Sequence, residues 1–261
     1  MSDQLSLRLE PALPNPPVTL RPMLARTLSE PFDSADHLFE PSWGGLRVLA
    51  VVGPAATAGG GSVVFLGADG VPLPIMPPEL AGLGVRVAAR SAVLDGELVV
   101  VDAAGRADPG ELARRRSGEP GRPVAFLVFD LLHLDGRSLL NQPLERRREQ
   151  LRRTLRPGDE VLTVPAIPAE GRALFQAVAA QGLAGVLARH RSSPYLCGVR
   201  SRLWRFTPTG QTGLDVERSP SMTVDAVTGD APVLALIRRL PLGLEDLDAT
   251  LADPATPDEP A

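Results

Sequence analysis

The sequence contains no lysine, and all 27 of its Lys and Arg positions are arginine. An exposed arginine carries the same charge as a lysine, but a guanidinium stays protonated and cannot attack as an amine nucleophile. Covalent catalysis by a lysine amine is therefore excluded, as is a phosphate-binding loop of the glycine–lysine type.

Cysteine and histidine are also scarce. The single cysteine, Cys197, excludes an internal disulfide and cannot build a zinc site alone. The three histidines, His37, His133 and His190, are scattered and lack the spacing of metal ligands. The side chains therefore give no sign of a transition-metal centre.

Long apolar runs, a basic overall charge and a leader pattern are missing as well. Pro, Gly and Arg interrupt every apolar stretch before it reaches membrane-spanning length. The start, MSDQ, is not the basic-then-apolar pattern of a signal peptide, so we expect a cytoplasmic protein. A formal net charge of −4 gives no global basic field to attract nucleic acid, although local arginine clusters can still bind phosphate.

The remaining composition is that of an ordinary globular protein, with 44% hydrophobic and 22% charged residues. Residues 1–20 are rich in proline and are predicted to form an N-terminal arm. Residues 21–212 are predicted to form one large domain. Residues 213–261 are predicted to be a short appendage that ends in an acidic, disordered tail.

The large domain is predicted to consist mainly of strands. Apolar and β-branched runs predict strands at 46–52 and 62–66, which form a hairpin, and further strands at 93–101, 124–132, 185–188 and 203–206. Two helices are predicted, at 144–155 after Pro143 and at 170–181 before Gly182.

Short motifs are spread through this domain in a fixed order. They are RPMLA at 21–25, FEPSWGGLR at 39–47, LDGELV at 94–99, FLVFDLLHLDGR at 126–137, PLERR at 143–147, GLAGVLAR at 182–189, SPY at 193–195 and RSRLW at 200–204. Each string alone is weak evidence, but together their order and spacing resemble the adenylation domain of ATP-dependent DNA ligases, and most closely the bacterial end-joining type.

The resemblance implies an α+β nucleotidyltransferase fold, in which two antiparallel sheets flanked by helices hold the nucleotide between them. Working ligases of this type continue into an OB-fold that closes over nicked DNA. The stretch after Trp204 is short and acidic, so we expect no complete OB-fold in this chain.

The family's chemistry depends on a lysine that attacks the α-phosphate of ATP and forms a lysyl-AMP intermediate. The family motif Glu-Pro-Lys-x-Asp-Gly-x-Arg places Ser42 at the lysine position and Gly44 at the aspartate position. A serine hydroxyl is a poor nucleophile without a base beside it. The resemblance therefore predicts that adenylate transfer is lost.

Other departures favour the same interpretation. Ala184 stands where the family has a metal-side glutamate, and Arg189 replaces a phosphate-binding lysine. Phe206 and Pro208 match two further lysines, and Ala68 matches an arginine. Drift of base composition explains a change from lysine to arginine but not these other changes, so relaxed catalytic constraint explains the set better.

Some residues on the ligand side are retained. The resemblance assigns nucleotide binding to Glu40, Arg47, Glu97, Phe129 and Arg189. Glu97 is also the candidate ligand of a Mg²⁺ ion, and Phe129 could stack on a purine. The structural alternative is that Phe129 is plain core, and that Glu97 and Asp130 cap turns or pair with arginines. Two cofactor assignments therefore stay open: ATP with Mg²⁺, or no cofactor at all.

We interpret the chain as a pseudoenzyme that keeps at most nucleotide binding, DNA-end binding or a scaffold role in DNA repair. One alternative is an active ligase with a nucleophile other than lysine, and another is a purely structural interaction domain. The expected partners are DNA ends, a repair protein or a nucleotide, and not a membrane.

The arginine runs at 114–116 and 146–148, continued by Arg152 and Arg153, are a separate candidate site. They could form a phosphate-binding stripe. The alternative, which we favour, is a solvated helix face on which Glu145 and Glu149 balance the arginines.

Overall fold

The computed structural model describes residues 20–55 and 61–210. The predicted appendage at 213–261 and nearly all of the predicted N-terminal arm lie outside these residues. Leu20, the last residue of that arm, is buried and packs against the core of the domain. No helix in the described part of the chain is long and apolar enough to cross a membrane.

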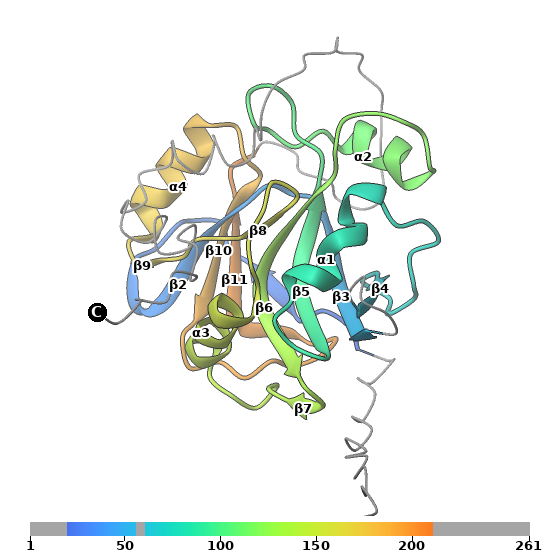
Figure 1. Ribbon diagram of the computed structural model, residues 1–261. Coiled ribbons are helices and arrows are strands. Elements are labelled where there is room, and N and C mark those ends of the chain that lie inside the picture. Colours follow the sequence, from blue (N-terminus) through green and yellow to red (C-terminus); the bar gives the residue numbers. More distant parts are fainter. Residues whose placement is uncertain (1–19, 56–60, 211–261) are drawn as a thin grey trace, which may run out of the picture.

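The described residues form two sheets (Figure 1). The first sheet has the strand order β1-β11-β10-β2-β9. Its strands are β1 (Leu24–Thr27), β2 (Ser34–Ser42), β9 (Ile167–Ala169), β10 (Gly185–His190) and β11 (Arg200–Pro208). All pairs are antiparallel except β1 with β11, which is parallel.

The second sheet has the order β4-β3-β5-β6-β7, with β8 pairing to β6. Its strands are β3 (Leu46–Ala55), β4 (Gly61–Leu66), β5 (Ala92–Val99), β6 (Ala125–Leu134), β7 (Arg137–Ser138) and β8 (Val161–Thr163). The β6–β8 pair is parallel and the others are antiparallel. The two sheets are therefore mainly, but not wholly, antiparallel.

Helices flank the sheets (Figure 1). They are the 3-10 helix η1 (Pro78–Gly82), α1 (Leu83–Arg86), α2 (Pro109–Arg116), α3 (Leu144–Thr154) and α4 (Gly171–Ala180). Helix α4 packs on β2 and β10 of the first sheet, while α1 packs on β3 and β4 and α3 packs on β6 of the second sheet. This is the α+β arrangement that the resemblance implied.

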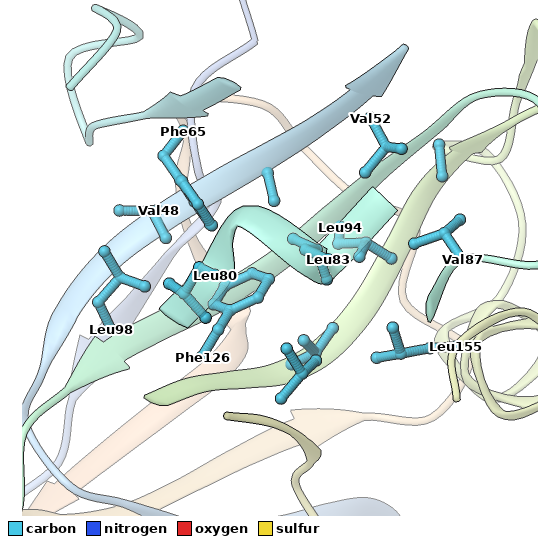
Figure 2. Packing of buried hydrophobic residues seen from close by; sticks show 14 of the residues in the cluster. Val48, Val52, Phe65, Leu80, Leu83, Val87, Leu94, Leu98, Phe126 and Leu155 are labelled. Carbon is cyan, nitrogen blue, oxygen red and sulfur yellow. The ribbon is translucent and has the colours of Figure 1, made fainter. Parts of the chain in front are cut away.

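The side chains of β6 alternate between the two faces of the second sheet, so they contribute to two separate hydrophobic clusters. Phe126 and Val128 point to the outer face of the second sheet, where they pack with Leu80 of η1, Leu83 of α1 and Leu155 after α3 (Figure 2). The intervening residues Leu127 and Phe129 point the other way, as a strand period of two requires. β6 therefore has apolar neighbours on both faces, which explains its almost uninterrupted apolar sequence.

The inner cluster combines residues of both sheets. Phe39 of β2 and Val186 of β10 pack there with Leu127 and Phe129 of β6. Trp43, in the turn between β2 and β3, is 1% exposed and belongs to the same cluster. The nucleophile-like motif thus lies at the junction between the two sheets.

The predicted strands and helices are confirmed with small shifts of their ends. The structure adds β1, β2, β7, β8, β9, η1, α1 and α2, which the sequence pattern did not predict. These are mostly elements of two to five residues, and they depend on neighbours far away in the chain. The eight-residue α2 begins at Pro109, and its Asp108 side chain accepts from the Glu111 backbone N–H at 2.9 Å, an N-cap that could have been predicted.

Candidate functional site

Ser42 is the last residue of β2 and pairs with Gly185 of β10. Its backbone carbonyl accepts a hydrogen bond from the Ala184 N–H at 3.1 Å, so the two positions where the family has lysine and glutamate are neighbours. The Ser42 side chain is half-buried and makes no hydrogen bond to any residue in the described ranges. Within the described residues, no base is therefore in place to activate its hydroxyl.

Glu97 anchors the turn that follows Ser42. One carboxylate oxygen accepts from the Trp43 N–H and the other from the Gly45 N–H, each at 3.1 Å. Burial raises the pKa of Glu97 above its ordinary value, although these N–H groups and Arg47 oppose the rise. In the structure Glu97 therefore caps a turn, which is the structural alternative given for this residue above.

The donor set around Glu97 does not fit a Mg²⁺ ion. Both of its carboxylate oxygens already accept backbone hydrogen bonds, and the family's second carboxylate is replaced by the methyl group of Ala184. Across residues 20–55 and 61–210, no three His, Cys, Asp or Glu side chains gather in a way that could hold a metal. Mg²⁺ needs several hard oxygen ligands, which this arrangement does not offer.

Arg47 of β3 is held by Asp95 of β5. Its Nε and Nη2 donate to the two carboxylate oxygens, both at 2.6 Å, and the Tyr195 hydroxyl donates to the same carboxylate at 2.7 Å. Burial opposes the charged form of Arg47, but Asp95 outweighs it and raises the pKa of the guanidinium above its ordinary value. Asp95 thus neutralises the charge of Arg47 and fixes the position of its guanidinium.

Two guanidinium groups lie over the Phe129 ring. The Cζ atom of Arg189 is 3.9 Å from the ring centroid, and that of Arg47 is 4.4 Å from it. Arg189 also lies 4.5 Å from the ring centroid of Trp204 in β11. These are cation–π distances, and Phe129 itself is 5% exposed.

Glu40 of β2 completes the cluster. Its carboxylate pairs with Arg148 of α3 and lies 3.0 Å from Nη1 of Arg189. Glu40 is 1% exposed, and burial raises its pKa although both arginines oppose the rise. Arg148 also donates to the carbonyls of Phe129 at 2.9 Å and of Val164 at 2.7 Å.

The structure therefore brings together all five residues that were assigned to nucleotide binding. Glu40 and Arg189 come from the first sheet, and Arg47, Glu97 and Phe129 come from the second. They contact one another and leave neither the Phe129 ring nor the Glu40 carboxylate open. In this arrangement the residues present do not fit ATP.

Three members of the cluster were not assigned to nucleotide binding: Asp95, Arg148 and Trp204. A signal for Arg148 exists in the sequence. Leu144, Leu151 and Leu155 define the buried face of α3, and the helical period places Arg147 and Arg148 on that same face. An arginine on an apolar face needs a buried acid, and the structure supplies one for each.

The arginine runs do not form a continuous stripe. Arg147 and Arg148 are buried in ion pairs, and Arg115 of α2 is buried against Glu79. The exposed members of α3 behave as the alternative predicted: Arg146 and Arg153 both pair with Glu149. The runs thus divide into core anchors and a solvated, charge-balanced helix face.

Comparisons with known proteins define the class. Residues 82–205 match the model of the ATP dependent DNA ligase domain. The chain is 34% identical over 166 residues to the multifunctional non-homologous end joining DNA repair protein LigD of Mycobacterium tuberculosis, covering 64% of this chain and 21% of that protein. It is 35% identical over 139 residues to a probable DNA ligase of Sorangium cellulosum, covering 49% and 26%.

Solved structures agree. A mycobacterial DNA ligase D complexed with ATP and MES superposes with a TM-score of 0.63 and 29% identity over 73% of this chain and 60% of that one. The ligase domain of LigD from M. tuberculosis gives a TM-score of 0.61 and 29% identity over 72% and 60%. The fold is thus that of a ligase-type nucleotidyltransferase domain.

The sequence matches narrow this class further. The chain carries a match to the ATP dependent DNA ligase domain and is homologous to the ligase domains of bacterial end-joining ligases. It spans only about a fifth to a quarter of the length of these curated relatives. The fold prediction is confirmed.

Proposed function

We propose that the chain is a catalytically degenerate ligase-like domain, a pseudoenzyme that does not form an AMP adduct. The observation that carries this proposal is Ser42 at the position of the nucleophilic lysine in a chain without any lysine. A guanidinium cannot replace the amine, because it does not lose its proton in a protein.

The surroundings of Ser42 support the proposal. No side chain among the described residues hydrogen-bonds its hydroxyl, and the family's aspartate and glutamate are Gly44 and Ala184. Glu97 is committed to the turn, with both oxygens accepting backbone hydrogen bonds. Nucleophile, base and metal ligand are therefore missing together, as relaxed constraint on catalysis would produce.

The proposed role is that of an accessory domain in DNA end joining in the bacterial cytoplasm, where it binds DNA ends or a repair partner. This role rests on the homology to LigD-type ligase domains. The purely structural interaction domain remains the second candidate, because the cluster around Phe129 and Glu40 is closed by arginines.

The adenylation test uses ATP labelled on the α-phosphate. The purified chain is incubated with this ATP and Mg²⁺ or Mn²⁺, and its intact mass is measured beside that of a lysine-bearing ligase domain. We expect an AMP adduct on the control and none on this chain. An adduct that disappears in Ser42→Ala would instead establish an active enzyme with a serine nucleophile.

The DNA-end test compares linear duplexes with closed circular DNA by fluorescence anisotropy and competition. Binding that prefers ends and weakens as salt is raised supports the DNA-end role, since phosphate contacts release counterions. Equal competition by circular DNA, or no binding at low salt, leaves the protein-scaffold role as the candidate.

A further inference from the structure

The contacts of Arg189 differ from those of the other buried arginines in the cluster. Arg147 and Arg148 donate to carbonyl groups in addition to their carboxylate partners. Arg189 is fully buried, yet its Nε, Nη1 and Nη2 make no hydrogen bond to any described residue. It is held by stacking on Phe129 and Trp204 and by the charge of Glu40.

This arrangement is poor for a guanidinium as a structural group. Burying its donors without acceptors is unfavourable. Burial lowers the pKa of Arg189 to about 10, although Glu40 opposes this. Arg189 therefore contributes less to the free energy of folding than Arg147 does. The described residues around Arg189 do not offer the hydrogen-bond acceptors that a buried arginine needs.

The surroundings suit a flat group with N–H donors. The Phe129 face offers stacking, and Oε2 of Glu40 is a buried acceptor without a hydrogen bond among the described residues. An aminopurine has both properties: a planar π surface and an exocyclic amine that donates to a carboxylate. The Arg189 guanidinium is also planar, bears N–H groups and lies 3.0 Å from that carboxylate.

We propose that Arg189 is a built-in occupant of a slot, formed by Phe129, Trp204 and Glu40, that would otherwise accept an aminopurine. The guanidinium and the base would need the same ring face and the same carboxylate, so they exclude each other. The slot is closed by this side chain, not by loss of its walls. This inference extends the proposed function by explaining how a ligase-like domain keeps its pocket shut to nucleotide.

The position of Arg189 in the fold makes the closure persistent. It lies on β10, between β11 and β2, paired to Trp204 on one side and to Leu38 on the other. Its backbone is therefore fixed within the sheet, and only a rotamer change would vacate the slot. Arg47, which is 24% exposed and held by Asp95, lies over the same ring.

The test measures adenosine binding by calorimetry and by thermal shift on the wild type, Arg189→Ala and Arg189→Lys. Both variants remove the planar guanidinium, and the lysine variant keeps the charge if the alanine variant does not fold. We expect adenosine to bind the variants at least about tenfold more tightly than the wild type, with a matching rise in melting temperature. Adenosine has no phosphate, so this result is independent of the adduct assay.

Two controls assign the gain to the slot. Arg205→Ala removes an arginine of the same sheet that does not lie over Phe129, and it should leave adenosine binding unchanged. Phe129→Leu in the Arg189→Ala background should abolish the gain, because the stacking face is lost.

Two results would overturn the proposal. One is adenosine binding by the wild type as tight as by the variants. The other is a variant that folds but does not bind adenosine. This result would be clearest for an Arg189→Ala protein that binds N-methylguanidinium, because that binding shows that the cavity is open.

Discussion

Arg147 and Asp130 form an ion pair with both side chains fully buried. Nε and Nη2 of Arg147 donate to the two carboxylate oxygens at 2.9 and 2.8 Å, and Nη1 donates to the Ser193 carbonyl at 2.9 Å. The pair joins α3 to β6, and the Ser193 contact ties both to the segment before β11. It is therefore a structural anchor next to the candidate site, and it is not available to a ligand.

Removing one partner of this pair leaves the other charge buried and uncompensated. We expect Arg147→Met or Asp130→Asn to lower the free energy of unfolding by about 3–5 kcal/mol. The double variant Arg147→Met with Asp130→Leu should recover most of that loss, because no orphan charge remains. Urea unfolding followed by circular dichroism measures all three, and a cost below about 1 kcal/mol for either single variant would contradict the anchor role.

The sequence was sufficient for most of the longer strands, but not for β2, and for both longer helices. β6 is a long apolar run, β5 is apolar on both sides of its Asp-Gly-Glu centre, and α3 and α4 have a helical period with clear ends at Pro143 and Gly182. Strands such as β8 and β9 have three residues each and no pattern of their own. They exist because β6 and β2 supply partners, which local sequence cannot reveal.

Five members of the candidate site were predictable from the sequence, but their contacts were not. The motifs identified Glu40, Arg47, Glu97, Phe129 and Arg189 because their positions along the chain are fixed by the family pattern. Which arginine pairs with which acid depends on packing between α3 and the two sheets. That packing brings Arg148 to Glu40 across 108 residues of chain, a separation at which sequence gives no pairing rule.

Glu97 should give the stability a recognisable pH dependence. Its folded pKa is raised by burial, so the native state holds the proton more tightly than the unfolded chain does. The resulting stabilisation is fully present below the unfolded pKa of about 4.3 and is lost as pH rises through the raised folded pKa.

Glu97→Gln isolates this effect. The variant lacks the titrating group and mimics the protonated carboxyl, because its amide also offers one acceptor and one donor side, so it should cost less than about 1 kcal/mol at pH 4. The wild type should then lose stability relative to the variant as pH rises to 8. Urea unfolding at several pH values measures the difference, and a cost that grows with pH would show that the charged carboxylate is the stabilising form.

Gly45 lies so close to β5 that its position has no room for a side chain. A Cβ atom at this position would lie 2.3 Å from the Leu98 carbonyl oxygen and 2.5 Å from Cγ1 of Val99. Both neighbours belong to the β5 segment, which cannot move without disturbing the pairing with β3. We expect Gly45→Ala to destabilise the fold by about 1–3 kcal/mol or more.

Gly82 supplies the matched control for that substitution. It is exposed, has a helical φ of −79° and ψ of −2°, and has no atom within 4 Å of an added Cβ. Gly82→Ala should therefore be neutral or stabilise by up to about 1 kcal/mol. Thermal melts of the two variants check the pair, and equal costs would show that the Gly45 turn shifts freely to accommodate a side chain.

Restoring the nucleophile alone should not restore adenylation. Ser42→Lys would place an amine where no aspartate or glutamate accompanies it, with Glu97 already bound to the turn. We expect its AMP adduct to form at least about a thousandfold more slowly than in a lysine-bearing ligase domain, since a single lost stabilising group can cost a hundredfold or more.

Adding the other missing groups tests whether they account for the loss. Gly44→Asp fills a left-handed position (φ 75°), which aspartate tolerates better than most residues. Ala184→Glu adds the second carboxylate, and Arg189→Lys removes the guanidinium from the Phe129 face. Combined with Ser42→Lys, these changes should bring a measurable adduct in the α-labelled ATP assay. A rapid adduct on Ser42→Lys alone would mean that the pocket is intact and that only the nucleophile has been lost.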